Sequence, residues 1–153
     1  RPMSELGNVA FKTRDVVELF RESLQLAPKI CEALILDCDD VEQFFQTNEM
    51  RLAQERIGEL TSLLEWLLQL ISGMQSIGGQ KLEEMHFGNV NVSESVNKMQ
   101  FLLGKLHLQL AGKQWDLFRG TLKDEFKPEI ISWKALFSDA AQSWNPHPST
   151  RDS

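Results

Sequence analysis

The residues that could do chemistry in this chain begin with Glu83 and His86. They form a Glu-x-x-His pair, which places both side chains on one face of a helix, as in the di-iron sites of helical bundles. Neither of the other histidines, His107 and His147, has a glutamate three residues before it. Half of such a site is missing, so we expect no metal centre. Because His107 borders an apolar helix face, we expect it to be partly buried and hydrogen-bonded rather than a base.

The two cysteines, Cys31 and Cys38, are the next candidates for reactivity. On one helix their separation corresponds to two turns, about 10 Å along the axis, which is too far for a disulfide. Both fall on an apolar face, where burial raises the pKa of a thiol and lowers its reactivity. We interpret them as buried apolar residues of a protein in a reducing compartment.

Other signatures of catalysis are missing from the sequence. No serine stands in a Gly-x-Ser-x-Gly setting, and Gly-Gly-Gln-Lys at 78–81 lacks the spacing of a phosphate-binding loop. Adjacent carboxylates such as Glu83-Glu84 and Asp39-Asp40 point apart on a helix, so they fit solvated or capping charges. We therefore predict a protein that is not an enzyme and that carries no cofactor.

Composition and charge exclude further classes of function. The chain has 153 residues, of which 42% are hydrophobic and 25% charged, as in an ordinary one-domain soluble protein. Its net charge of −6 opposes binding to nucleic acid or to an anionic membrane. The longest apolar stretch, at 60–74, contains Glu65 and Gln69 and is too short and too polar to span a bilayer. We expect a cytoplasmic protein that neither binds nucleic acid nor inserts into a membrane.

The first half of the chain predicts two long helices, because apolar residues recur there at alternating steps of three and four. Thr13 is the expected cap of the first helix, Pro28 is expected to kink it, and the aspartates at 37–40 predict its break. The second helix has the widest apolar stripe, ends at Gly78-Gly79 and is expected at the centre of the fold. The two stripes comprise Val17, Phe20, Leu24, Ala27, Cys31, Leu34 and Cys38, then Met50, Ala53, Ile57, Leu60, Leu64, Leu67, Ile71 and Met74.

Two more helices are predicted after an irregular segment at 80–92, which contains a short helical piece stopped by Gly88. Asn91 and Glu94 form a capping signature at the start of the third helix. Ala-Gly-Lys at 111–113 is expected to be a turn or a kink before the fourth helix.

Pro128 stands inside the predicted fourth helix, on the face opposite Phe126 and Ile130. The carbonyl that the proline leaves without a donor therefore faces water, which lowers the cost of the lost hydrogen bond. We expect a bend near 124–128. The alternative is a clean break in which Pro128 begins a new helix.

These patterns predict an all-α fold, because no segment keeps the two-residue alternation of a strand for more than a few positions. Short connections between long helices indicate an up-and-down bundle of about four helices, with kinks near Pro28 and Pro128. The expected organisation is an N-terminal arm over 1–12, a helical bundle domain over 13–144 and a disordered tail over 145–153.

The second half of the chain resembles a group of small helical bacterial proteins of uncharacterised function. In that group a Leu-Glu-Trp-Leu helix is followed by a final helix that ends in Glu-x-x-Pro-x-x-x-x-Trp. This chain departs from the group where an aromatic-acidic-leucine run is expected, because it has Lys-Asp-Glu-Phe at 123–126. The resemblance implies a bacterial, cytoplasmic, non-catalytic bundle associated with motility or cell-surface assembly. It covers about residues 55–137, and the matching residues are Leu64 to Leu67, Glu125, Pro128 and Trp133.

A contact surface is expected on the outer side of the third helix. If Val96 and Leu103 face the core, Phe101 and Leu108 point outwards, and Trp115 extends their line where the helix continues through the turn. Rows of exposed large apolar side chains mark contact surfaces in soluble proteins, and aromatic residues favour hot spots. The alternative is that the segment at 80–90 covers this row.

The predicted function is a non-catalytic module that binds a protein partner or a second copy of itself through its helix faces. One alternative is a metal-binding bundle that uses Glu83 and His86. Another is a small-ligand pocket at a place where bent helices splay apart. The residues predicted to contact the partner are Phe101, Leu108, Trp115, Met85 and Phe87.

Overall fold

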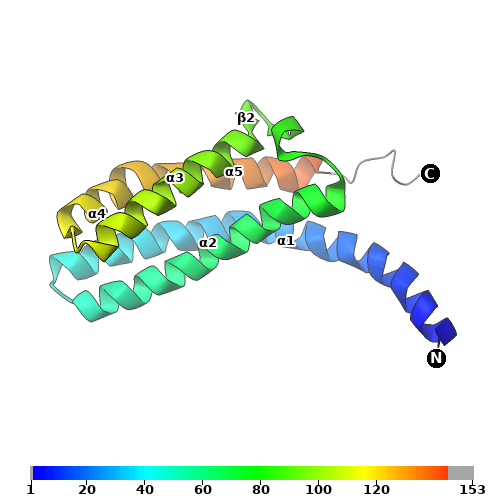
Figure 1. The fold of residues 1–153 in the computed structure, drawn as a ribbon, viewed down its shortest axis with the longest axis horizontal. Coiled ribbons are helices and arrows are strands. Elements are labelled where there is room, and N and C mark those ends of the chain that lie inside the picture. Colours follow the sequence, from blue (N-terminus) through cyan, green and yellow to red (C-terminus); the bar gives the residue numbers. More distant parts are fainter. Residues whose placement is uncertain (1, 145–153) are drawn as a thin grey trace.

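The described residues fold into four helical rods that alternate in direction, as the computed structural model in Figure 1 shows. The structure describes residues 2–144, with side chains from residue 16 onwards. The rods are α1 (Pro2–Gln46), α2 (Met50–Gly78), α3 (Val92–Ala111) and a continuous fourth rod of α4 (Trp115–Thr121), the π-helical turn η2 (Leu122–Phe126) and α5 (Lys127–Ser143). The predicted all-α, up-and-down bundle is therefore confirmed.

Helix α1 is longer than its sequence suggested at both ends. It begins at Pro2, so Thr13 lies inside it and residues 2–12, expected as an arm, form its first turns. A proline suits the first position of a helix, where its missing N–H has no partner to lose. The helix runs through Pro28 without interruption, and its N-terminal part projects beyond the other rods (Figure 1). The tail expected over 145–153 lies outside the described residues.

The break expected at the acidic cluster of residues 37–40 is wrong, because α1 continues through it to Gln46. Cations from other rods face these carboxylates. Arg56 of α2 lies 3.6 Å from the Oδ1 of Asp37 and also pairs with Asp40, while the Nζ of Lys127 lies 2.5 Å from the Oδ1 of Asp39. The aspartates thus cross-link α1 to α2 and α5, and this tertiary pairing outweighs their preference for caps and turns.

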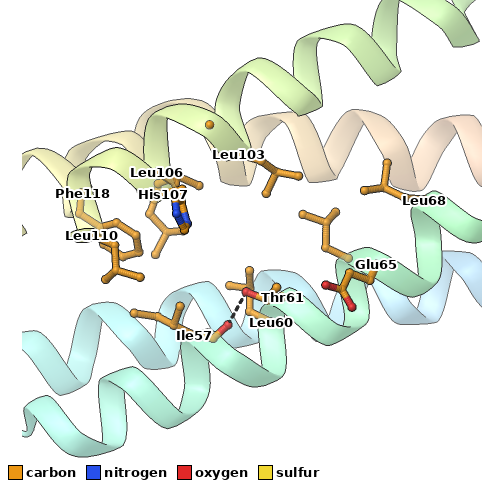
Figure 2. A pocket seen from close by; sticks show the side chains of 13 residues that line it. Ile57, Leu60, Thr61, Glu65, Leu68, Leu103, Leu106, His107, Leu110 and Phe118 are labelled. Carbon is orange, nitrogen blue, oxygen red and sulfur yellow. Dashed lines mark hydrogen bonds between the residues drawn. The ribbon is translucent and has the colours of Figure 1, made fainter. Parts of the chain in front are cut away.

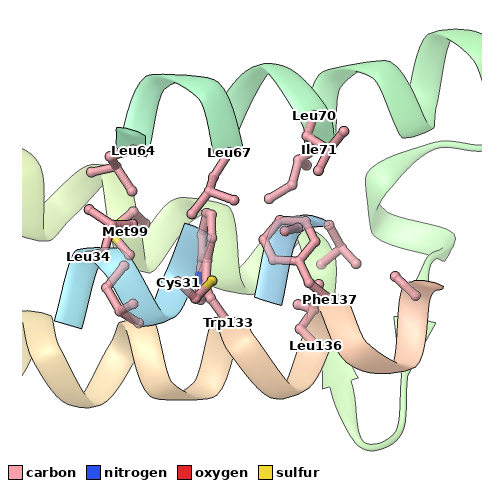
Figure 3. Close-up of a cluster of buried hydrophobic side chains, with 14 of the residues drawn as sticks. Cys31, Leu34, Leu64, Leu67, Leu70, Ile71, Met99, Trp133, Leu136 and Phe137 are labelled. Atoms are coloured by element: carbon pink, nitrogen blue, oxygen red, sulfur yellow. The ribbon is translucent and has the colours of Figure 1, made fainter. Parts of the chain in front are cut away.

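The core lies where α1, α2 and α5 meet (Figure 3). Its largest fully buried side chains are Trp133, Phe126 and Phe137. Leu64 and Leu67 of α2 are buried in the same cluster, as the apolar stripe of α2 predicted. Full burial of a leucine or phenylalanine side chain contributes about 1.5–3 kcal/mol, so this apolar contact is the main source of the fold's stability.

The connection between α2 and α3 is a short irregular segment rather than a helix. Gly79, at φ 75°, ends α2 in the left-handed conformation. A single 3-10 turn, η1 (Leu82–Glu84), then leads into a hairpin of β1 (His86–Phe87) and β2 (Val90–Asn91), paired antiparallel as His86 with Asn91 and Phe87 with Val90. Gly88, at φ 64°, supplies the positive φ that this tight turn needs. The short helical piece predicted before Gly88 is thus reduced to one turn.

Helix α3 begins with the Asn91 cap that its sequence predicts. The side-chain Oδ1 of Asn91 accepts a hydrogen bond of 3.0 Å from the backbone N–H of Glu94. This bond satisfies one of the donors that the first helical turn leaves free. At the other end, α3 stops at Ala111, and Lys113 adopts a φ of 55° in the turn that follows.

The fourth rod accommodates Pro128 without a break. The backbone N–H of Lys127 donates to the carbonyl of Leu122, five residues back, which makes η2 a π-helical turn. Pro128 follows this turn at the beginning of α5 and is exposed. A π-helical turn therefore stands next to the position where a bend was expected, and the chain does not break at Pro128.

Candidate functional site

An apolar groove of about 490 Å³ lies between α2 and α3 (Figure 2). Its buried floor combines residues of α2, α3 and the fourth rod, and its exposed rim comes from α2 and α3. The floor consists of Leu60, Leu64, Leu106, Phe118 and Leu122, the half-buried walls of Ile57, Leu68, Leu103 and Leu110, and the rim of Thr61, Glu65, Gly104 and His107.

Ion pairs join α3 to the fourth rod. The Nζ of Lys98 lies 3.1 Å from the Oε1 of the buried Glu129, and the Nζ of Lys105 lies 2.7 Å from the Oε2 of Glu125. Glu129 also accepts a hydrogen bond of 3.2 Å from the indole N–H of Trp133. Among the described residues no ion pair joins α3 to α2. Beside α2 the space is open, and apolar residues line both of its walls.

The polar side chains of the groove are few and lie at its exposed rim. The hydroxyl of Thr61 already donates to the carbonyl of Ile57 at 2.9 Å. Glu65 and His107 belong to opposite walls and both are exposed, so the partial burial expected for His107 is wrong (Figure 2). Gly104 adds no side chain to the rim, and a Cβ placed there would meet nothing within 4 Å. The groove therefore offers a ligand or partner mainly an apolar surface to pack against.

Phe101 and Leu108 lie on the outer side of α3, as predicted. Their side chains are 69% and 72% exposed, so the segment at 80–90 does not cover them. Phe101 stands three residues before Gly104 and Leu108 four residues after it, which places all three on one helix face. Since Gly104 also lines the groove, the apolar surface continues from the groove onto this face.

The other three predicted contact residues lie elsewhere. Met85 and Phe87 are only 3% and 8% exposed, because the hairpin turns them into the core while His86 faces solvent. Trp115 does not extend the line of Phe101, because α3 ends at Ala111 and the chain turns before α4. The ring of Trp115 instead packs 5.7 Å from that of Phe45 at the end of α1. A partner could not reach Met85 or Phe87 in this structure.

The residues considered for metal binding and for thiol chemistry do not form reactive sites. Glu83 belongs to η1 and His86 to β1, so the helical spacing that suggested a metal pair does not apply. In the part of the chain that the structure describes, no three His, Cys, Asp or Glu side chains come together as a metal site requires. Cys31 and Cys38 are buried free thiols, and burial raises the pKa of each to about 12.

A second cavity, of about 100 Å³, lies between α1 and the region around η2. Four of its five charged lining residues form ion pairs with one another. Arg119 of α4 contacts Glu42, and Lys127 contacts Asp39. These pairs join the fourth rod to α1, so we interpret this cavity as part of a structural contact.

The sequence did not reveal the groove, although it held a signal for it. Among the leucines that widen the apolar stripe of α2, Leu68 is the one that lines the groove. On α3, Leu103 and Leu110 continue an apolar row beside Gly104. An excess of apolar width on two adjacent helices is what a groove between them requires.

The fold and the site thus define the class of protein: an all-helical bundle with an open apolar groove. A family model described as a domain of unknown function, DUF8042, matches residues 18–136, from the bundle part of α1 to Leu136 in α5. The chain belongs to this family. No curated protein and no solved structure gave a match.

Within residues 2–144, no helix combines the length and the apolar character needed to cross a membrane.

Proposed function

We propose that the protein is a non-catalytic interaction module that binds a helix of a partner protein in the groove between α2 and α3. The groove itself is the observation that carries this proposal. It follows α2 from Ile57 to Leu68, which at the rise of a helix is about 16 Å, or three turns. An amphipathic helix buries its apolar face in such a groove through residues spaced at i, i+3 or i+4, and i+7.

Phe101 and Leu108 support the same function from the neighbouring face of α3. Large apolar side chains that solvent reaches this freely are typical of contact surfaces. Since the groove and this face share Gly104, one partner can cover both. Truncation of an aromatic anchor at a protein interface often costs about 2 kcal/mol or more in binding free energy.

A small apolar ligand is the second candidate, because the volume of about 490 Å³ lies in the ordinary range for ligand pockets. The open rim and the scarcity of polar groups to orient a ligand favour a helix over a small molecule. The partner is either a different protein or a second copy of this chain, and the mass in light scattering distinguishes the two. The free buried thiols fit a cytoplasmic location.

Two glycine substitutions test the proposal. Gly104→Leu fills the mouth of the groove, and Gly58→Leu is its control, because both positions are helical and open while only Gly104 lines the groove. Leucine favours a helix more than glycine does, so both variants should fold. We expect proteins retained from a lysate of the native host by the wild type and by Gly58→Leu to be lost with Gly104→Leu.

A third variant, Phe101→Ser with Leu108→Ser, tests the adjoining face. We expect it to weaken the same association while the helical circular dichroism stays unchanged, because both side chains are exposed. Retention of every partner by Gly104→Leu would contradict the proposal. Unfolding of the double variant would show instead that Phe101 and Leu108 stabilise the bundle.

A further inference from the structure

The charge around the groove is unevenly distributed. Among the residues that line it, Glu65 is the one with a formal charge at neutral pH. Glu59, the other acidic residue of this part of α2, does not line the groove and pairs with Arg56, whose Nε lies 3.1 Å from its Oε2. The groove therefore has an apolar floor and a single negative charge, that of Glu65, on its α2 wall.

The basic residues of α3 do not offset this charge. The ammonium groups of Lys98 and Lys105 are engaged with Glu129 and Glu125, which belong to the fourth rod on the other side of α3. On the groove side, α3 contributes Gly104 and His107 to the rim. The whole chain has a net charge of −6, which adds to the negative potential that an approaching partner meets.

Resting on the proposed function, we infer that the groove selects a basic amphipathic helix, with lysine or arginine beside its apolar face. Apolar residues on about three turns of that helix fill the space between Ile57 and Leu68. A cation on its flank meets Glu65. Such complementarity of charge adds specificity and speeds association more than it adds affinity.

The same distribution of charge argues against a fatty acid or an acidic lipid. An acyl chain would suit the apolar floor, but its carboxylate or phosphate would need a cation. Among the lining residues His107 is the one side chain that can become cationic, and Glu65 would repel the headgroup. The chemistry of the rim thus favours a cationic helix over an anionic lipid.

Two synthetic helical peptides of about 14 residues test this inference. They share the same leucine positions and differ only in their flanks, which are lysine in one and glutamate in the other. Fluorescence anisotropy measures their binding to the full chain, to Glu65→Gln, to Gly104→Leu and to Glu55→Gln. Glu55 is the matched control, because it is an exposed glutamate of α2 that does not line the groove.

We expect the lysine peptide to bind the wild type more tightly than the glutamate peptide, with a preference that falls as salt increases. Glu65→Gln should weaken binding of the lysine peptide by about two- to fivefold, as loss of an exposed ion pair would. Glu55→Gln should leave its affinity unchanged, and Gly104→Leu should abolish binding of both peptides.

The outcomes separate this inference from the proposed function. Equal affinities for the two peptides, or an unchanged affinity in Glu65→Gln, would overturn the inference while sensitivity to Gly104→Leu still supports a helix-binding groove. Displacement of the lysine peptide by palmitate at lower concentrations than by unlabelled peptide would also overturn it. Binding of neither peptide, or binding insensitive to Gly104→Leu, would overturn the proposed function itself.

Discussion

Arg119 and Glu42, 77 residues apart in sequence, form a bidentate ion pair that joins α4 to the last turns of α1. The Nη2 of Arg119 lies 2.7 Å from one carboxylate oxygen of Glu42, and its Nε lies 3.1 Å from the other. The guanidinium also lies 5.9 Å from the centre of the Phe45 ring. Paired, half-buried contacts of this geometry are among the stronger charged interactions of a protein surface.

Substitution of Glu42 should therefore lower stability in a way that depends on pH. The hydrogen bonds from Arg119 hold the pKa of Glu42 below its ordinary value of 4.5. The stabilisation is present above the pKa of the unfolded chain and is lost as pH falls through the lowered pKa of the fold. We expect Glu42→Gln to lower the free energy of unfolding by about 1 kcal/mol at pH 7, measured by urea denaturation. An equal loss at pH 3 would contradict this origin.

Substitution of Asp37, which is buried on α1, should change the free energy of unfolding in the opposite direction. Burial raises its pKa above the ordinary value of 3.8, the charge of Glu59 adds to this, and the contact with Arg56 only partly opposes it. The cost of the buried charge is absent below pH 3.8 and complete above the raised pKa. Asp37→Asn should raise the free energy of unfolding at pH 7 by about 1 kcal/mol, with the gain disappearing on acidification. Destabilisation at pH 7 would mean that the pair with Arg56 outweighs burial.

Two glycines of α2 should respond in opposite ways to alanine. A Cβ at Gly73 would lie 2.4 Å from a ring carbon of Phe20, which is itself packed 5.0 Å from Trp144. Gly73→Ala should lower the free energy of unfolding by about 1–3 kcal/mol, because the added methyl group overpacks this contact. At Gly58 a Cβ meets nothing within 4 Å, so Gly58→Ala should stabilise the helix by about 0.5–1 kcal/mol. Similar melting temperatures for both variants would refute the close approach at Gly73.

The two cysteines should be unreactive until the protein opens. Burial raises the pKa of Cys31 and Cys38 to about 12, so almost no thiolate is present at pH 8. We expect an aromatic disulfide reagent such as DTNB to titrate both thiols at once in denaturant and to react far more slowly with the native chain. Fast reaction of either thiol in the native state would show that its helix face is accessible.

The helix faces could be predicted because burial imposes their period. Leu60, Leu64 and Leu67 are buried as the stripe of α2 required, and Asn91 caps α3 as its spacing indicated. The aspartates of α1 failed as a break signal, because their partners come from α2 and α5 and are invisible to local sequence. The same limitation applied to Met85 and Phe87, whose direction is set by a two-residue hairpin rather than by a helical period.

The contact surface was predicted only in part, for a related reason. Phe101 and Leu108 follow from the period of a single helix, so their exposure could be inferred. The groove depends on the distance between α2 and α3, which is set by the packing of the whole bundle. Contacts between residues far apart in the chain, such as those of Lys98 and Lys105 with the fourth rod, leave no mark in the spacing of nearby residues.

Because of the widened turn η2, the fourth rod should tolerate the deletion of one residue. Phe118, Leu122, Phe126 and Ile130 are all buried, and each stands four residues from the next. In a regular α-helix that spacing would rotate each side chain about 40° from the one before, and the π-helical turn takes up this surplus. Deletion of the exposed Asp124 would leave steps of four, three and four, the spacing of an ordinary amphipathic helix. The rod should therefore shorten by one residue and keep the same four side chains inside.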